Sequence, residues 1–66
     1  SEGVHWYRQA IERQPRRAVL HANLSICLDR LGRRSEAAQA LRRALEIEPD
    51  NQQFAQGMRA LEGAER

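Results

Sequence analysis

The sequence predicts an all-α protein built from antiparallel helix hairpins that stack on one another. Apolar residues recur every three or four positions in four successive segments, as they do along one face of an α-helix. A similar phrase precedes both Pro15 and Pro49, which lie 34 residues apart. A phrase that returns at such a fixed spacing is typical of helical repeats. With 66 residues, the chain is expected to form one small domain at most.

The first expected helix spans roughly residues 2–14 and carries an apolar stripe of Val4, Tyr7 and Ile11. Trp6 lies beside this stripe and is expected to be about half exposed. One interpretation is that Trp6 packs against a further helix on its N-terminal side. The other is that the chain associates with a second copy through Val4 and Trp6, because exposed apolar faces favour association.

The second expected helix spans roughly residues 17–31, where five apolar residues fall on one stripe. Gly32 follows and can adopt the left-handed conformation in which many helices end. The lone cysteine of the chain lies on the stripe, which predicts a buried thiol rather than a disulfide. The stripe consists of Leu20, Leu24, Cys27, Leu28 and Leu31.

A third helix is expected over roughly residues 35–47, with Ser35 as its N-cap. Its inward face carries small alanines, which allow two helix backbones to approach closely. Since only a few residues separate it from the second helix, the two are expected to form an antiparallel hairpin. This face consists of Ala37, Ala40, Leu41, Ala44 and Leu45.

The fourth helix is expected over roughly residues 51–63, with Asp50 and Gln53 as a capping box. Its apolar residues Phe54, Met58 and Leu61 lie on one stripe. Gly57 in its interior costs about 1 kcal/mol of helix stability relative to Ala.

Residues 18–51 resemble one complete tetratricopeptide repeat (TPR), and the phrase at 44–51 is especially characteristic. His21 in place of a larger aromatic residue and Leu28 in place of Tyr depart from the family pattern. Residues 3–16 resemble the second helix of a preceding repeat, and 52–66 the first helix of a following repeat or a capping helix. The resemblance implies a short right-handed superhelix, an α-solenoid fragment. The matching positions are His21, Leu24, Ser25, Leu28, Gly32, Ala37, Leu41, Ala44 and Pro49.

By this resemblance, the chain would bind a protein segment in the concave groove lined by the first helix of each repeat. In related modules that hold a C-terminal carboxylate, an Asn at the place of Asn23 donates to the ligand. The basic partners of such a clamp are absent here, since Gln53 and Gly57 occupy the matching places on the next helix. An apolar segment or a second subunit is therefore expected. The groove candidates are Val19, Ala22, Asn23, Ile26, Asp29 and Arg30.

The charge pattern does not indicate a nucleic-acid partner. The net charge is +2, and nine acidic residues are interspersed among eleven basic ones, all of them Arg. The absence of Lys is typical of a GC-rich genome, which favours a bacterial source. An RNA-binding helical array is a weaker interpretation of the arginines. A helix-turn-helix DNA-binding protein is another, but it leaves the 34-residue spacing unexplained.

Neither catalysis nor cofactor binding is expected. A zinc site requires four ligands, whereas the chain offers only His5, His21 and Cys27 beside its carboxylates. No apolar run is long enough to span a membrane. Since the chain opens with Ser1 and the resemblance is cut at both ends, we expect a fragment of a longer protein. The alternative function is a helical accessory region of a larger enzyme, where it positions a protein substrate.

Overall fold

A computed structural model describes residues 2–64, which form four α-helices and no β-strand. The helices are α1 (Glu2–Arg13), α2 (Ala18–Arg30), α3 (Arg34–Ile47) and α4 (Gln52–Ala64). Each helix boundary lies within one residue of its expected place. The prediction of an all-α fold is confirmed. The last predicted segment, 52–66, extends past the described residues at its final two positions.

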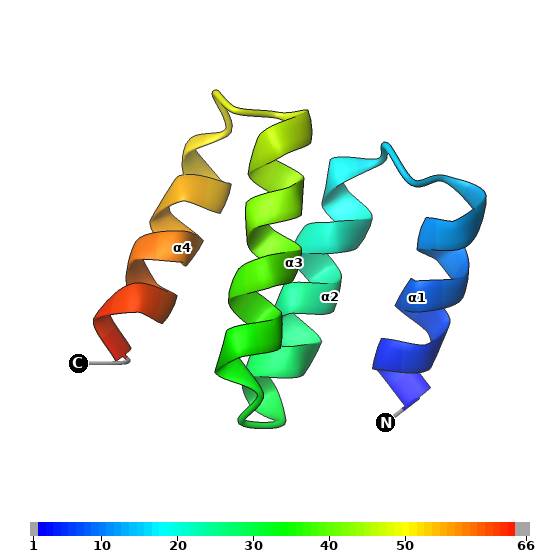
Figure 1. The fold of residues 1–66 in the computed structure, drawn as a ribbon, viewed down its shortest axis with the longest axis horizontal. Coiled ribbons are helices and arrows are strands. Elements are labelled where there is room, and N and C mark those ends of the chain that lie inside the picture. Colours follow the sequence, from blue (N-terminus) through cyan, green and yellow to red (C-terminus); the bar gives the residue numbers. More distant parts are fainter. Residues whose placement is uncertain (1, 65–66) are drawn as a thin grey trace.

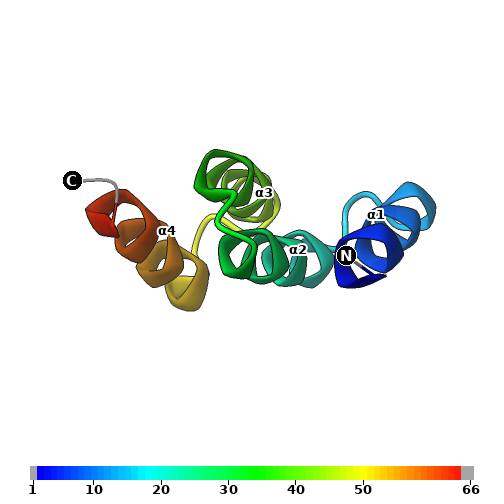
Figure 2. The same ribbon diagram turned by 90° about the horizontal axis from the view of Figure 1, so that it is seen from below.

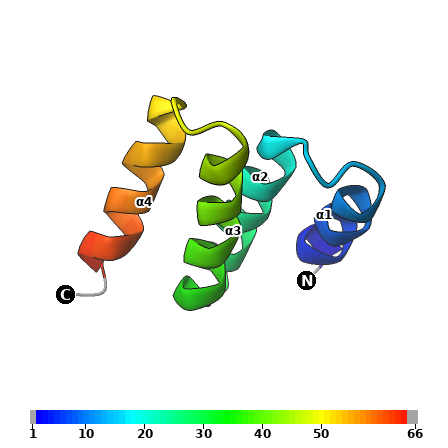
Figure 3. The same ribbon diagram turned by 45° about the horizontal axis from the view of Figure 1, so that its top comes forward.

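Successive helices run antiparallel and lie side by side in chain order, so that α2 and α4 point in the same direction (Figure 1). Each helix packs mainly on its neighbours in the sequence, α1 on α2, α2 on α3 and α3 on α4. Seen along the helices, α3 lies to one side of the line that joins α2 and α4 (Figure 2). A tilted view shows the same order, with α1 and α4 at the two ends (Figure 3). This is the stacked-hairpin arrangement predicted from the sequence.

The core is densest between α2 and α3. Ala37 and Ala44 of α3 are completely buried, and Leu28 of α2 is only 1% exposed. Alanine at these two places lets the helices approach closely enough to enclose Leu28. Further residues from all four helices complete the core, among them Val4, Ala18, Leu24, Leu41 and Leu61.

The turn between α2 and α3 depends on Gly32, whose φ of +79° lies in the left-handed region. The N–H of Gly32 donates to the carbonyl of Asp29, and that of Arg33 donates to the carbonyl of Leu28, both at 2.9 Å. These two bonds form a Schellman motif, so the predicted role of Gly32 is confirmed. Leu31, which was expected on the buried stripe, is 47% exposed because it is the C-cap residue of α2.

Two predicted helix caps were wrong. Helix α3 begins at Arg34, so Ser35 lies inside the helix, and the N-cap Arg33 makes no capping bond with its side chain. Helix α4 is capped by Asn51 instead of Asp50. The Asn51 Oδ1 atom accepts a bond of 3.0 Å from the backbone N–H of Phe54, which satisfies one of the free donors at the start of α4.

Candidate functional site

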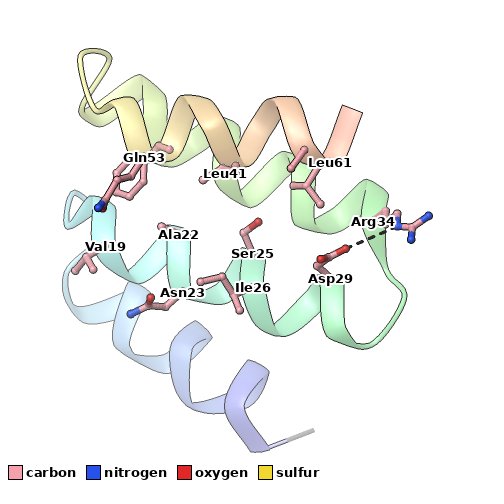
Figure 4. A pocket seen from close by; sticks show the side chains of 13 residues that line it. Val19, Ala22, Asn23, Ser25, Ile26, Asp29, Arg34, Leu41, Gln53 and Leu61 are labelled. Carbon is pink, nitrogen blue, oxygen red and sulfur yellow. Dashed lines mark ion pairs between the residues drawn. The ribbon is translucent and has the colours of Figure 1, made fainter. Parts of the chain in front are cut away.

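A hollow of about 440 Å³ lies between α2 and α4, with α3 beneath it (Figure 4). We call it the α2–α4 groove. Five of the six candidates predicted from the sequence line it, namely all except Arg30. They share the groove with residues of α3 and α4. The lining consists of Val19, Ala22, Asn23, Ser25, Ile26, Asp29, Arg34, Leu41, Gln53, Phe54, Gly57, Ala60 and Leu61.

Most of the groove surface is apolar. Val19 and Ile26, about two turns apart on α2, are 43% and 51% exposed and line the same groove. Ala22 lies between them and is 8% exposed. The groove therefore has two projecting apolar side chains separated by a small one.

The opposite wall, on α4, includes two small residues beside the larger Phe54 and Leu61. Gly57 and Ala60 face the groove, and Leu41 of α3 forms part of its floor. With Ala22 on α2, both walls of the groove include small residues. This arrangement leaves room for large side chains of a bound molecule. Gly57 and Ala60 are visible in the sequence as small residues, but they indicate a groove wall only once α4 is placed next to α2.

Two amides add hydrogen-bonding capacity to the apolar walls. Asn23, which is half-buried, lies on α2, and Gln53 lies in the first turn of α4. Within the described part of the chain, neither side chain has a hydrogen-bond partner. Each amide offers both donors and an acceptor, so each can bond to the backbone of a peptide.

An ion pair stands at the far end of the groove from Val19 and Gln53 (Figure 4). The Nε atom of Arg34 lies 3.8 Å from Oδ1 of Asp29, and both side chains are about half exposed. Arg34 is therefore a basic residue of the groove lining, whereas the predicted candidate Arg30 lies outside that lining. The pair neutralises Asp29, so the groove carries little net charge.

The structure separates the two residues predicted for self-association. Trp6 is 59% exposed and contacts Tyr7 edge to face, with ring centroids 5.0 Å apart. Val4 is only 6% exposed and belongs to the core. A surface for a second copy on α1 can therefore include Trp6 but not Val4.

The histidines and the cysteine form no reactive cluster. The buried ring of His21 donates from Nε2 to the carbonyl oxygen of Pro15 at 2.9 Å, a bond that ties α2 to the end of the preceding loop. Cys27 is partly buried. Among residues 2–64, no three potential ligands gather as a metal site would require. No helix in that range is both long enough and apolar enough to cross a bilayer.

Comparison with protein families identifies a matching family. A family model described as "Tetratricopeptide repeat" matches residues 4–61, which includes most of the four helices and the whole groove. Comparison with curated proteins and with solved structures gives no match.

Proposed function

This chain belongs to the tetratricopeptide repeat family, and we propose that it binds a segment of another polypeptide in the α2–α4 groove. Repeats of this family generally mediate protein–protein interactions and are typically non-catalytic modules. The observation that carries the proposal is the exposure of Val19 and Ile26 on the groove wall. Such exposed aliphatic side chains are stabilised when a partner removes them from water.

The groove favours an uncharged, apolar segment of the partner. Its walls are mostly apolar, and the ion pair between Asp29 and Arg34 leaves no excess charge to attract a carboxylate tail. Large apolar side chains of the segment would enter the space above Leu41, between Ala22 and Gly57. Burial of each such side chain contributes about 1.5–3 kcal/mol before the entropic cost of association.

The amides of Asn23 and Gln53 would hold the backbone of the segment. They lie on opposite walls of the groove, on α2 and α4. A peptide backbone that enters the groove loses hydrogen bonds to water, and these amides can replace them. Such bonds set the direction and position of the segment more than they increase its affinity.

The test starts from a random peptide library displayed on phage and selected on the 66-residue chain. Enriched peptides are measured by fluorescence anisotropy against the wild type, Ile26→Glu and Leu31→Glu. Both substitutions place a carboxylate at an exposed aliphatic position of similar accessibility, 51% and 47%, but only Ile26 lines the groove.

We expect enriched peptides with large apolar residues, and a loss of binding of at least about tenfold in Ile26→Glu alone, because burying an unpaired charge is costly. Circular dichroism checks that both variants keep their helices. Equal binding to Ile26→Glu and Leu31→Glu would place the binding surface elsewhere and refute the proposal.

A further inference from the structure

The α2–α4 groove runs lengthwise between two helices that point in the same direction (Figures 1 and 4). Its lining on α2 extends from Val19 to Asp29, which are ten positions apart, or about 15 Å at the helical rise. On α4 the lining extends from Gln53 to Leu61. A segment that follows the groove therefore lies alongside both helices for about three turns.

The polar side chains of the groove lie mainly toward its two ends. The amides of Asn23 and Gln53 lie toward the end at which α2 and α4 begin, and the ion pair of Asp29 with Arg34 lies at the other end (Figure 4). Between them the lining is apolar except for Ser25, which is 3% exposed. An extended backbone would lose its hydrogen bonds to water along this stretch and find few partners there. An α-helix satisfies the same groups internally.

The small residues of both walls also suit a helix as the occupant. Ala22 lies on α2, and Gly57 and Ala60 lie on α4. Two helices approach to roughly 8–10 Å between their axes, depending on the side chains at the contact. Val19 and Ile26 project on either side of Ala22, so large side chains of another helix can enter the space between them.

We propose that the occupant is a single amphipathic α-helix of a partner protein, packed antiparallel to α2 and α4. This inference rests on the proposed function and adds the conformation and the direction of the bound segment. The apolar stripe of the helix would face Ile26 and Leu41, and its C-terminal end would lie beside Gln53. With α3 as the floor of the groove, the bound helix completes an arrangement of four packed helices.

Charge complementarity selects the antiparallel direction. The C-terminal end of a helix carries four carbonyl groups that have no donor within the helix, and the amides of Asn23 and Gln53 can donate to them. Both α2 and α4 begin at this end of the groove, and neither has an acidic residue in its first turn. The positive ends of both helix dipoles therefore favour the negative C-terminal end of the occupant. A parallel helix would bring its own positive end there.

A proline scan tests the conformation of the bound segment. The probes are synthetic copies of the peptides enriched on phage, acetylated and amidated to remove the terminal charges. Fluorescence anisotropy with the 66-residue chain first identifies the peptide positions that tolerate Ala, and Pro then replaces the residue at each of them. Interior prolines should weaken binding at least about tenfold, because Pro breaks a helix, whereas Pro at the first helical position should be tolerated. An extended segment would tolerate the interior prolines as well.

Gln53→Glu tests the direction of the bound helix. The new carboxylate would lie among the C-terminal carbonyls of an antiparallel helix and should weaken binding about two- to tenfold. A parallel helix would place its N-terminal N–H groups there, and Gln53→Glu would strengthen binding. Gln52→Glu is the matched control, because Gln52 is also exposed in the first turn of α4 but does not line the groove. This control should bind as the wild type does.

The outcomes separate this inference from the proposed function. Harmless interior prolines, or tighter binding to Gln53→Glu, would overturn the inference and leave the groove as the binding site. Peptides that bind Ile26→Glu as well as the wild type would refute the groove itself, and the inference with it.

Sedimentation velocity of the chain without peptide tests a second copy as the occupant. We expect no dimer that depends on the groove. A dimer that is lost in Ile26→Glu and kept in Leu31→Glu would show that another copy of the chain fills the groove, and it would also overturn the inference.

Discussion

A Cβ atom placed on Gly57 would lie 2.9 Å from the Cδ2 atom of Leu41. Helix α4 therefore approaches α3 so closely that a side chain at position 57 would have to displace the end of the Leu41 side chain. Leu41 is 5% exposed and packed in the core, so a shift of its methyl group would disturb that packing. A residue that lowers the intrinsic stability of α4 is thus the one that permits its packing.

Gly57→Ala should lower the free energy of unfolding by roughly 1 kcal/mol. The contact with Leu41 costs about 1–3 kcal/mol as overpacking, and the better helix propensity of Ala offsets about 1 kcal/mol of it. Gly63→Ala is the matched control, because nothing lies within 4 Å of the added Cβ there. Urea unfolding followed by circular dichroism measures both. Equal stability of the two variants would contradict the close approach of α4 to α3.

Asn51→Ala should lower the free energy of unfolding by about 0.5–2 kcal/mol, as loss of an N-cap does. The reason is the 3.0 Å bond that the Asn51 side chain accepts from the N–H of Phe54. Asp50→Ala, one residue earlier, should change stability by less than about 0.5 kcal/mol. Thermal and urea unfolding of the two variants distinguish them. If Asp50→Ala proved the more harmful, the cap would be Asp50 after all.

His21→Ala should lower the free energy of unfolding by about 1–3 kcal/mol, because it removes a buried ring and its bond to the carbonyl of Pro15. His5 is exposed, so His5→Ala should stay within about 0.5 kcal/mol of the wild type. Chemical unfolding provides the comparison. A harmless His21→Ala would show that the bond to Pro15 does not secure the loop between α1 and α2.

Asn23→Ala should weaken the binding of groove peptides about two- to tenfold, the usual range for one hydrogen bond. The amide has no partner in the described structure that its loss would disturb, so stability should change little. Gln39→Ala on α3, outside the groove, is the control for loss of an exposed amide. Fluorescence anisotropy with the selected peptides measures both. Unchanged affinity in Asn23→Ala would remove this residue from the proposed interface.

Periodicity alone predicted the number of helices and most of the core. The spacing of Leu20, Leu24 and Leu28 along α2 places all three on one face, and all three are buried. Leu31 continues that spacing but is exposed, because the chain leaves the helical path at the C-cap before Gly32. The apolar spacing can continue past the residue at which the helix ends. The burial of the last residue in a stripe is therefore the hardest to predict.

The groove could be predicted only on the wall formed by α2. Val19, Asn23 and Ile26 follow from their positions on one helix, whereas the opposite wall depends on how α4 packs on α3. Arg34 was missed because it pairs with Asp29 across a turn. The geometry of that turn, which Gly32 sets, cannot be predicted from the spacing of apolar residues along the helices. Val4 was expected both on the apolar stripe of the first helix and at a self-association surface. Its burial in the folded chain places it in the core.

Helix α4 is held mainly by α3, yet it forms one complete side of the α2–α4 groove. A helix that packs mainly on one neighbour can separate from the described helices at lower energy than one that packs on two, such as α2. A polypeptide seated between α2 and α4 would give α4 a further packing surface. Occupancy would then tighten the whole array, and the slowed hydrogen exchange of α4 amides would report it.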